Sequence, residues 1–224
     1  MSNYSDLPIN YEEKCLCVLV LDVSGSMEGA PIDELNNGVR AFLSDINKNP
    51  TLRQRLEVGI ITFNGKVKTI RPTALMDQFS IDFPPLVAGG TTATVDAVNT
   101  AIEMVTARKL WYKATGQTYG RSWVILMTDG DPDGNQNLSL LSSKLSQDVM
   151  QKKYEFLPIA VGDGTYISRL AALQVNLPVM RLQGLKFTSF FQWLSASFDK
   201  AIKDPKFTLD AAVNGPKDWG FQSV

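Results

Sequence analysis

Histidine is absent from the 224-residue chain. Its absence excludes a Ser-His-Asp triad, removes the commonest general base, and excludes any metal site built on imidazole nitrogen. Cysteine occurs only twice, as Cys15 and Cys17 in one apolar run. Alternate residues of a strand face the same way, so a bridge between these two would strain the backbone. We therefore expect reduced thiols in the core, as in a cytoplasmic protein.

An excess of charge of either sign is also missing, because 22 Lys and Arg residues balance 23 Asp and Glu residues. A net charge of −1 gives no general attraction to nucleic acid or to a membrane surface, and we predict neither as a partner. No apolar run approaches the roughly 18 residues of a membrane span. Residues 1–14 have no basic and apolar leader, so we expect no secretory signal.

What the sequence does contain is a regular alternation of apolar runs and helical periods. The run at 16–23 is continuously apolar, which is typical of a strand buried on both faces. From Pro31 onward, apolar residues recur every three or four positions, as on one face of an amphipathic helix. The same criteria predict strands at 16–23, 122–130, 154–164 and 179–182, a hairpin at 57–72 that turns at Asn64-Gly65, and helices at 31–46, 95–105, 138–149, 166–174 and 189–203.

Strands that alternate with helices predict an α/β fold, with a parallel sheet covered by helices on both faces. The hairpin adds one antiparallel strand at an edge of the sheet. We find no linker and expect one domain, 1–224, divided into an N-terminal extension 1–13, a core 14–203 and a C-terminal tail 204–224. We expect the tail to pack back onto the body through Phe207, Trp219 and Phe221.

Polar residues gather where the predicted strands end. Asp22 closes the first strand and is followed by Ser24 and Ser26, Asp129 closes the strand at 122–130, and Thr91 follows a Gly-Gly pair before a helix. Ligands of such sheets bind at the carboxyl ends of the strands, so we expect these three loops to meet. Carboxylate and hydroxyl oxygens suit Mg²⁺ or Mn²⁺, with Ca²⁺ a weaker fit, and do not suit zinc or copper.

This set of residues resembles the metal-ion-dependent adhesion site of von Willebrand factor A (VWA) domains. The family pattern is D-x-S-x-S, then a threonine after a glycine-rich loop, then an aspartate after the fourth strand. The sequence has Asp22, Ser24 and Ser26 in "DVSGSM", Thr91 in "GGTT" and Asp129 in "MTDG". The resemblance implies that these five residues hold the metal, with Ser24, Ser26 and Thr91 in direct contact.

The family resemblance extends over most of the chain. It implies a Rossmann-like, three-layer fold with a six-stranded, mostly parallel sheet. The segment "LDVSGSMEGAPIDELNNGV" is most similar to stand-alone bacterial VWA proteins of the tellurium-resistance (TerY) type. Bacterial members are often linked with phosphatase-, kinase- or ATPase-like proteins, so the resemblance implies partners of that kind.

Two details of the site leave alternatives open. Thr92 competes with Thr91, and we prefer Thr91 because it directly follows Gly89-Gly90, where the backbone can approach closely. The stretch 129–140 matches the first positions of an EF-hand loop, but Leu140 stands where the bidentate Glu should be and a strand precedes it. We reject an EF-hand and expect Asp131 and Asp133 to form an acidic rim, which predicts basic residues around a partner's carboxylate.

A basic and aromatic stretch, "KLWYKATGQTYGRS", lies between the second long helix and the strand at 122–130. Its length suggests a loop over residues 108–121. A solvated loop whose aromatic rings cover the edge of the core is the first interpretation. A partner-docking surface is the second, because aromatic and Arg residues are frequent in interface hot spots. Nucleic-acid binding is a weaker third.

The sequence therefore predicts a binding module rather than an enzyme. In this hypothesis a bound Mg²⁺ or Mn²⁺ captures a Glu or Asp carboxylate of a protein partner, in a complex of the bacterial stress or tellurium-resistance type. One alternative is a metal-dependent phosphatase or hydrolase that uses Asp22 or Asp129. Another is a scaffold whose metal site is degenerate.

Overall fold

The computed structural model describes residues 7–78, 84–134, 136–162, 167–182, 184–204 and 206–214. One six-stranded sheet, in the order β3-β2-β1-β4-β5-β6, forms the centre. Every neighbouring pair is parallel except β2 and β3, which are antiparallel. The strands are β1 (Cys15–Asp22), β2 (Leu56–Phe63), β3 (Val67–Ala74), β4 (Trp123–Thr128), β5 (Glu155–Val161) and β6 (Met180–Leu182). The predicted α/β fold, with one antiparallel edge strand, is confirmed.

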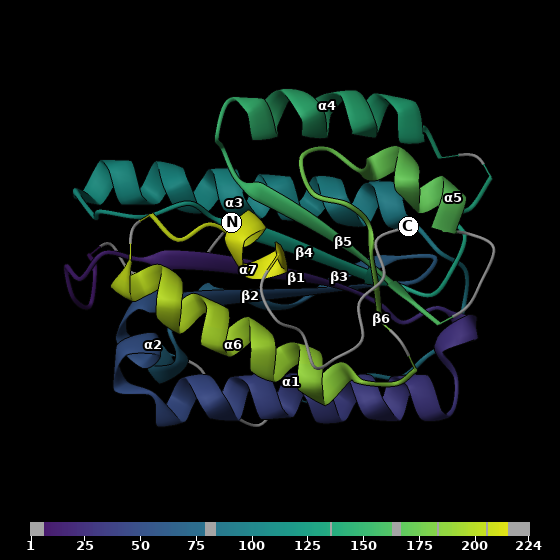
Figure 1. Ribbon diagram of the computed structural model, residues 1–224, viewed down its shortest axis with the longest axis horizontal. Helices are drawn as coiled ribbons and strands as arrows, with labels where there is room; N and C mark the ends of the chain where they lie inside the picture. The colour runs from purple at the N-terminus through teal and green to yellow at the C-terminus, as the bar shows by residue number, and fades with distance from the viewer. Residues whose placement is uncertain are drawn as a thin grey trace.

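Helices cover both faces of this sheet (Figure 1). On one face lie α1 (Ala30–Lys48), α2 (Pro50–Arg55), α6 (Phe187–Lys203) and α7 (Leu209–Asn214). On the other lie α3 (Thr94–Thr115), α4 (Leu138–Met150) and α5 (Ile167–Leu170). Short 3-10 turns complete the chain: η1 (Gly25–Met27), η2 (Met76–Gln78) and η3 (Ala171–Leu173). None of the helices in the described ranges is long and apolar enough to cross a membrane.

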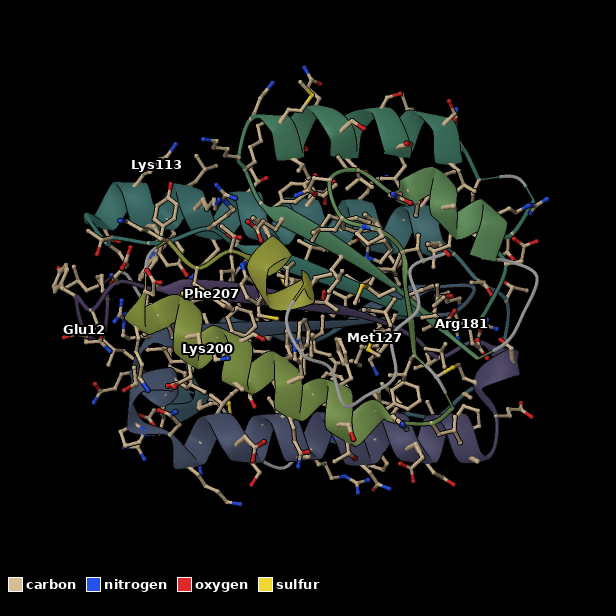
Figure 2. All side chains as sticks on the ribbon, in the orientation of Figure 1. Glu12, Lys113, Met127, Arg181, Lys200 and Phe207 are labelled. Carbon is tan, nitrogen blue, oxygen red and sulfur yellow. The ribbon has the colours of Figure 1, made fainter. Side chains whose placement is uncertain are left out.

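The alternation of side chains along β1 divides the core into two halves. Cys15, Cys17, Leu19 and Leu21 pack toward α1 and α6, whereas Leu16, Val18 and Val20 pack toward α3 and α4. Every residue of β1 is buried, so neither half of the core is open to solvent along this strand. Both cysteines are buried and unpaired, as predicted. Figure 2 shows Met127 of β4 inside the layer beneath α6, while Glu12 and Lys113 point away from the body.

Pro158 lies within β5, where a missing N–H would normally weaken a sheet. It pairs with Leu126 of β4, and β6 joins the other flank of β5 only from Ile159 onward. The proline therefore lies where that outer flank has no strand partner, which explains why the strand tolerates it.

The prediction of a loop at 108–121 is wrong for its first half, because α3 continues to Thr115. Arg108 is buried and donates from Nε and Nη2 to the carboxylate of Glu57 at 2.5 and 2.6 Å. The buried hydroxyl of Tyr112 donates to the same carboxylate at 2.8 Å. The guanidinium also lies 3.9 Å from the centre of the Trp111 ring. Arg108 and Tyr112 hold the amino end of β2 and are unavailable to a partner.

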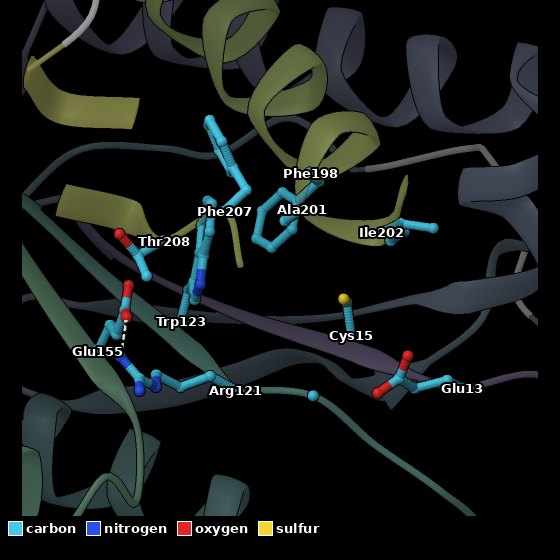
Figure 3. A pocket seen from close by; sticks show the side chains of 11 residues that line it. Glu13, Cys15, Arg121, Trp123, Glu155, Phe198, Ala201, Ile202, Phe207 and Thr208 are labelled. Carbon is cyan, nitrogen blue, oxygen red and sulfur yellow. Dashed lines mark hydrogen bonds and ion pairs between the residues drawn. The ribbon is translucent and has the colours of Figure 1, made fainter. Parts of the chain in front are cut away.

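The C-terminal tail packs back onto the amino edge of the sheet, as far as it is described. A cavity of about 240 Å³ there is lined by Trp123, Phe198 and Phe207 among others, and Figure 3 shows their rings grouped above Arg121 and Glu155. The Glu155 carboxylate accepts from Arg121 at 2.5 Å and from the Leu209 N–H at 2.9 Å. Trp219 and Phe221 lie outside the described residues.

Candidate metal centre

Two loops meet where β1 ends. After Asp22 the chain enters η1, and the Gly25 N–H donates to the carbonyl of Gly90 at 3.0 Å. The Gly89 N–H returns a bond to the carbonyl of Val23 at 2.9 Å. Gly90 has a φ of 87°, a left-handed conformation that glycine adopts without strain. These main-chain bonds fix the D-x-S-x-S loop against the Gly-Gly-Thr-Thr loop.

Asp22 is a buried carboxylate held only by neutral donors. Asp22 is 1% exposed. Oδ1 accepts from the Ser24 N–H at 2.8 Å, and Oδ2 accepts from the hydroxyl of Thr128. Burial raises the pKa of Asp22 to about 6, and the charge of Asp129 adds to the rise, while the bonds from Ser24 and Thr128 oppose it. Within the described part of the chain, no lysine or arginine pairs with Asp22 or Asp129.

The two serines connect this carboxylate to the loop after β4. Ser24 Oγ lies 3.0 Å from Ser26 Oγ, and Ser26 Oγ donates to Oδ1 of Asp129 at 2.6 Å. Burial raises the pKa of Asp129, and the bond from Ser26 partly offsets the rise. Ser26 is exposed and Asp129 is half-buried, so the group opens to solvent on their side. The structure thus brings together four of the five predicted residues.

The structure brings Thr92, rather than Thr91, beside the other four residues. Thr91 is exposed, and its hydroxyl faces Gly65, with Oγ1 2.8 Å from where a Cβ on that glycine would lie. Thr92 is 7% exposed, and its Oγ1 lies 3.1 Å from where a Cβ on Gly130 would be. Oδ2 of Asp22 and Oγ of Ser26 each lie 3.5 Å from that same point.

Contacts made by the β2–β3 turn explain this difference. The Asn64 side chain donates to the carbonyl of Gly89 at 2.7 Å, and the Ala93 N–H donates to the carbonyl of Asn64 at 2.7 Å. The turn therefore holds residues 89–93 from outside and draws Thr91 toward Gly65. The sequence signal was the Asn64-Gly65 turn itself, but which threonine it would draw depends on a contact 25 residues away.

Asp131 and Asp133, the residues of the expected acidic rim, are exposed and also form bonds within the protein. Both carboxylate oxygens of Asp133 accept from the Thr92 N–H at 3.2 Å. Asp131 forms an ion pair with Arg169 at 3.0 Å. Gln136, which no sequence motif singles out, accepts from the Val95 N–H and donates to the Thr92 carbonyl, both at 2.6 Å. Asp133 and Gln136 therefore hold the threonine loop, while Asp133 stays exposed to solvent.

The oxygens at this edge form a donor set that fits a small, hard dication. Two carboxylates can balance its charge, hydroxyls add neutral oxygen, and no soft ligand is among them. The described residues contain no group of three His, Cys, Asp or Glu side chains that could hold a metal. The cluster around Asp22 relies on hydroxyls instead. Gly130 contributes by having no side chain, because a Cβ there would crowd Oγ1 of Thr92 and touch the oxygens of Asp22 and Ser26.

A parallel sheet between two layers of helices, with polar loops converging at its carboxyl edge, defines a Rossmann-like α/β protein. The model of the von Willebrand factor type A domain matches residues 17–176, and the chain belongs to this family. Domains of the family are generally protein-interaction modules, many of them metal-dependent. No curated protein matches the chain significantly.

Several solved structures share the fold. The PilB minor pilin from Streptococcus sanguinis superposes with a TM-score of 0.62 at 12% identity, over 93% of this chain and 65% of that one. A von Willebrand factor type A protein from Catenulispora acidiphila gives 0.63 at 14%, over 83% and 42%. The pilus adhesin SpaC from Lactobacillus rhamnosus GG gives 0.64 at 16%, over 88% and 32%. The chain spans less than two thirds of each, and such low identity shows the fold alone.

Proposed function

We propose that this chain is a metal-dependent protein-binding module. Mg²⁺ or Mn²⁺ would be held by Asp22, Ser24, Ser26, Thr92 and Asp129, and would capture a Glu or Asp carboxylate of a protein partner. The observation that carries the proposal is Asp22, a carboxylate buried at the sheet's carboxyl edge with neutral donors only. A buried charge normally has a charged partner, and the partner missing here is a cation.

The donor chemistry favours capture of an anion. Hydroxyls bring no charge, so two carboxylates are the whole negative complement of the site. A dication held in this way retains affinity for one more anionic oxygen. The exposed Ser26 and half-buried Asp129 leave the cation accessible from solvent on one side. This is the property expected of a site that binds the side chain of another protein.

The finer assignments are proposals of the same kind. We propose a bacterial, cytoplasmic module of the tellurium-resistance type, with partners among phosphatase-, kinase- or ATPase-like proteins. The buried free thiols support the cytoplasmic placement. A pilus adhesin and a minor pilin share the fold, which is compatible with a binding role on this scaffold. We propose no catalysis, because both carboxylates of the site would be engaged by the cation and neither would remain to act as a base.

Calorimetric titration of EDTA-stripped protein with MnCl₂ and MgCl₂ tests the metal site. We expect one cation per chain, abolished by Asp22→Asn and weakened at least tenfold by Thr92→Val. Thr91→Val should bind normally, and so should Asp131→Asn, which removes a carboxylate from the same loop without touching the oxygens of the site. A chain that binds no divalent cation would instead be a scaffold with a degenerate site.

Capture of a carboxylate is measured separately on the Mn²⁺ complex. Water-proton relaxation reports the water molecules bound to Mn²⁺, and an acidic peptide that occupies a coordination position should lower it. The same peptide with Gln in place of Glu should not. Turnover of a phosphoester substrate that survives purification and is lost in Asp22→Asn would overturn the binding role in favour of a metal-dependent hydrolase.

A further inference from the structure

A groove runs beside the candidate metal centre, between β3 and the segment that precedes Gly89. Its volume is about 390 Å³, and its lining includes Val23, Asn64, Lys66, Lys68 and Val87. Val23 stands between Asp22 and Ser24 in the chain, and Asn64 bonds to the carbonyl of Gly89. The groove therefore begins at the loops that carry the candidate ligands.

One part of the groove lining is basic. Lys66 and Lys68 are exposed, and no described carboxylate pairs with either. On the far side of the metal centre, Asp131 is already paired with Arg169 and Asp133 is bonded to the Thr92 N–H. Both aspartates are exposed and keep their negative charges, so the negative charge lies on that side of the centre, whereas the positive charge of Lys66 and Lys68 lies on the groove side. The groove side therefore favours acidic residues of a partner.

The other part of the lining is apolar. Ile70 is half-buried, and Val87 is 78% exposed, so the floor and rim of the groove present hydrocarbon to solvent. Two prolines, Pro84 and Pro85, stand on the same side and are exposed. An apolar side chain seated there would bury Val87, which the fold leaves uncovered.

The sheet register gives the distance between the two features. Asp22 lies beside Phe63 on β2, and Phe63 lies beside Val67 on β3. Strands are spaced about 4.8 Å apart, so Val67 is roughly 10 Å from Asp22 across the sheet. A peptide in the extended polyproline II conformation rises about 3.1 Å per residue and repeats its side-chain direction every three residues, so two side chains three positions apart span that gap on the same side. Lys66 and Lys68 flank Val67 in the chain.

We infer that the groove binds the continuation of the partner segment, and this inference rests on the proposed function. The occupant is an extended acidic segment of a protein. One of its carboxylates reaches the cation, a second about three residues away lies between Lys66 and Lys68, and an apolar residue between them packs on Val87. The partner is thus chosen by two acids at fixed spacing, not by one alone.

Fluorescence anisotropy with labelled peptides tests the groove in the presence of Mn²⁺. The probe contains Glu-Leu-Ala-Glu between Gly-Ser flanks, and its comparison peptides carry Gln or Lys at the fourth position. We expect the probe to bind at least about tenfold more tightly than the Lys peptide, because exposed charges at an interface act mainly through such complementarity. Equal binding of all three would overturn the groove inference.

Protein variants separate the two proposals. Lys66→Glu/Lys68→Glu should weaken the probe about tenfold while leaving Mn²⁺ affinity unchanged. Lys113→Glu/Lys200→Glu makes the same change in net charge at other exposed positions and should have little effect. Val87→Ser should weaken the probe about threefold. Mn²⁺-dependent binding of the probe that none of these substitutions weakens would overturn the groove inference alone. Probe binding that is unchanged both without Mn²⁺ and in Asp22→Asn would overturn the proposed function itself.

Discussion

Two buried carboxylates at opposite ends of the sheet are treated in opposite ways. Glu57 at the amino end and Asp22 at the carboxyl end are each 1% exposed. Glu57 receives the guanidinium of Arg108 at two atoms and the hydroxyl of Tyr112. Asp22 receives one backbone N–H and one hydroxyl. The protein therefore neutralises the charge of Glu57 from within, whereas the described residues supply no cation for Asp22, and we propose that a bound metal supplies it.

The difference separates a structural site from a binding site by chemistry alone. At the amino edge, the charge of Glu155 is also balanced within the protein. Its carboxylate accepts from Arg121 (Figure 3) on one oxygen and from the Leu209 N–H on the other. At the carboxyl edge the hydroxyls near Asp22 contribute no charge, so the described residues leave its negative charge unbalanced. Removing one partner of a buried ion pair is strongly destabilising, whereas a buried carboxylate without a cation has a raised pKa and gains from a bound ion of opposite charge.

Of the substitutions considered, Glu57→Gln should lower the stability of the protein most. It leaves Arg108 buried without a carboxylate, and we expect unfolding free energy to fall by about 3–5 kcal/mol. Urea titration followed by circular dichroism measures the change. Glu13→Gln, which affects the more exposed pair with Arg55, should cost less than about 1 kcal/mol. A loss for Glu57→Gln no larger than for this control would contradict the structural role of the buried pair between Glu57 and Arg108.

Adding Mg²⁺ should stabilise the protein through the candidate metal centre. At a free Mg²⁺ concentration a hundred times the dissociation constant, binding to the folded state alone raises unfolding free energy by about 2.7 kcal/mol. We expect this gain in wild-type protein and in Asp131→Asn, and none in Asp22→Asn. Urea titrations with Mg²⁺ and with EDTA give the comparison. An equal gain in Asp22→Asn would show that the cation binds elsewhere.

Asp22→Asn should stabilise the protein in EDTA, in contrast to Glu57→Gln. The folded-state pKa of Asp22, about 6, lies above its ordinary value of 3.8. The folded state therefore holds the extra proton between those values, and metal-free stability falls as pH rises from about 4 to about 6. Above pH 7 the neutral amide should be more stable by about 1–2 kcal/mol.

Unfolding curves of both proteins at pH 5 and pH 7.5 check the sign. The advantage of Asp22→Asn should be larger at pH 7.5 and should shrink toward pH 5. A variant that is less stable than wild type at pH 7.5 in EDTA would show that the charge of Asp22 is already compensated by the protein.

Gly130→Ala should have the smallest effect. Its methyl group would lie 3.1 Å from Oγ1 of Thr92, which must shift by a few tenths of an ångström, and 3.5 Å from two other candidate ligands, which need not move. We expect Mn²⁺ affinity to fall about threefold, with stability in EDTA changed by less than about 1 kcal/mol. Gly134→Ala in the same loop meets nothing within 4 Å and should bind Mn²⁺ normally. Equal affinities for the two variants would place the cation away from Gly130.

The order of strands and helices was predictable because each signal is local. The continuous apolar run of β1 and the apolar face of α1 depend on residues a few positions apart. The length of α3 was not predictable in this way, because its last turns are fixed by Arg108 and Tyr112 reaching Glu57 more than fifty residues away. A polar, aromatic sequence looks like a loop until that carboxylate is placed beside it.

The candidate site shows the same division. The motif placed Asp22, Ser24, Ser26 and Asp129 correctly at one edge. The choice between Thr91 and Thr92 depends on the Asn64 turn, and the roles of Asp133 and Gln136 depend on a loop about forty residues distant. The sequence of this loop gave no sign that the exposed Asp133 would bond to the main chain of another loop.

The loops of the centre are joined through their main chains. Gly25 bonds to Gly90, Gly89 to Val23, and Asp133 to Thr92, all between N–H and carbonyl groups. Apart from the glycines at 89 and 90, whose positive φ favours glycine, such bonds do not depend on which side chains are attached. The edge of the sheet is therefore a frame on which ligands can be exchanged by mutation while the loops keep their positions, so that a lineage can gain, retune or lose the metal without first losing the fold.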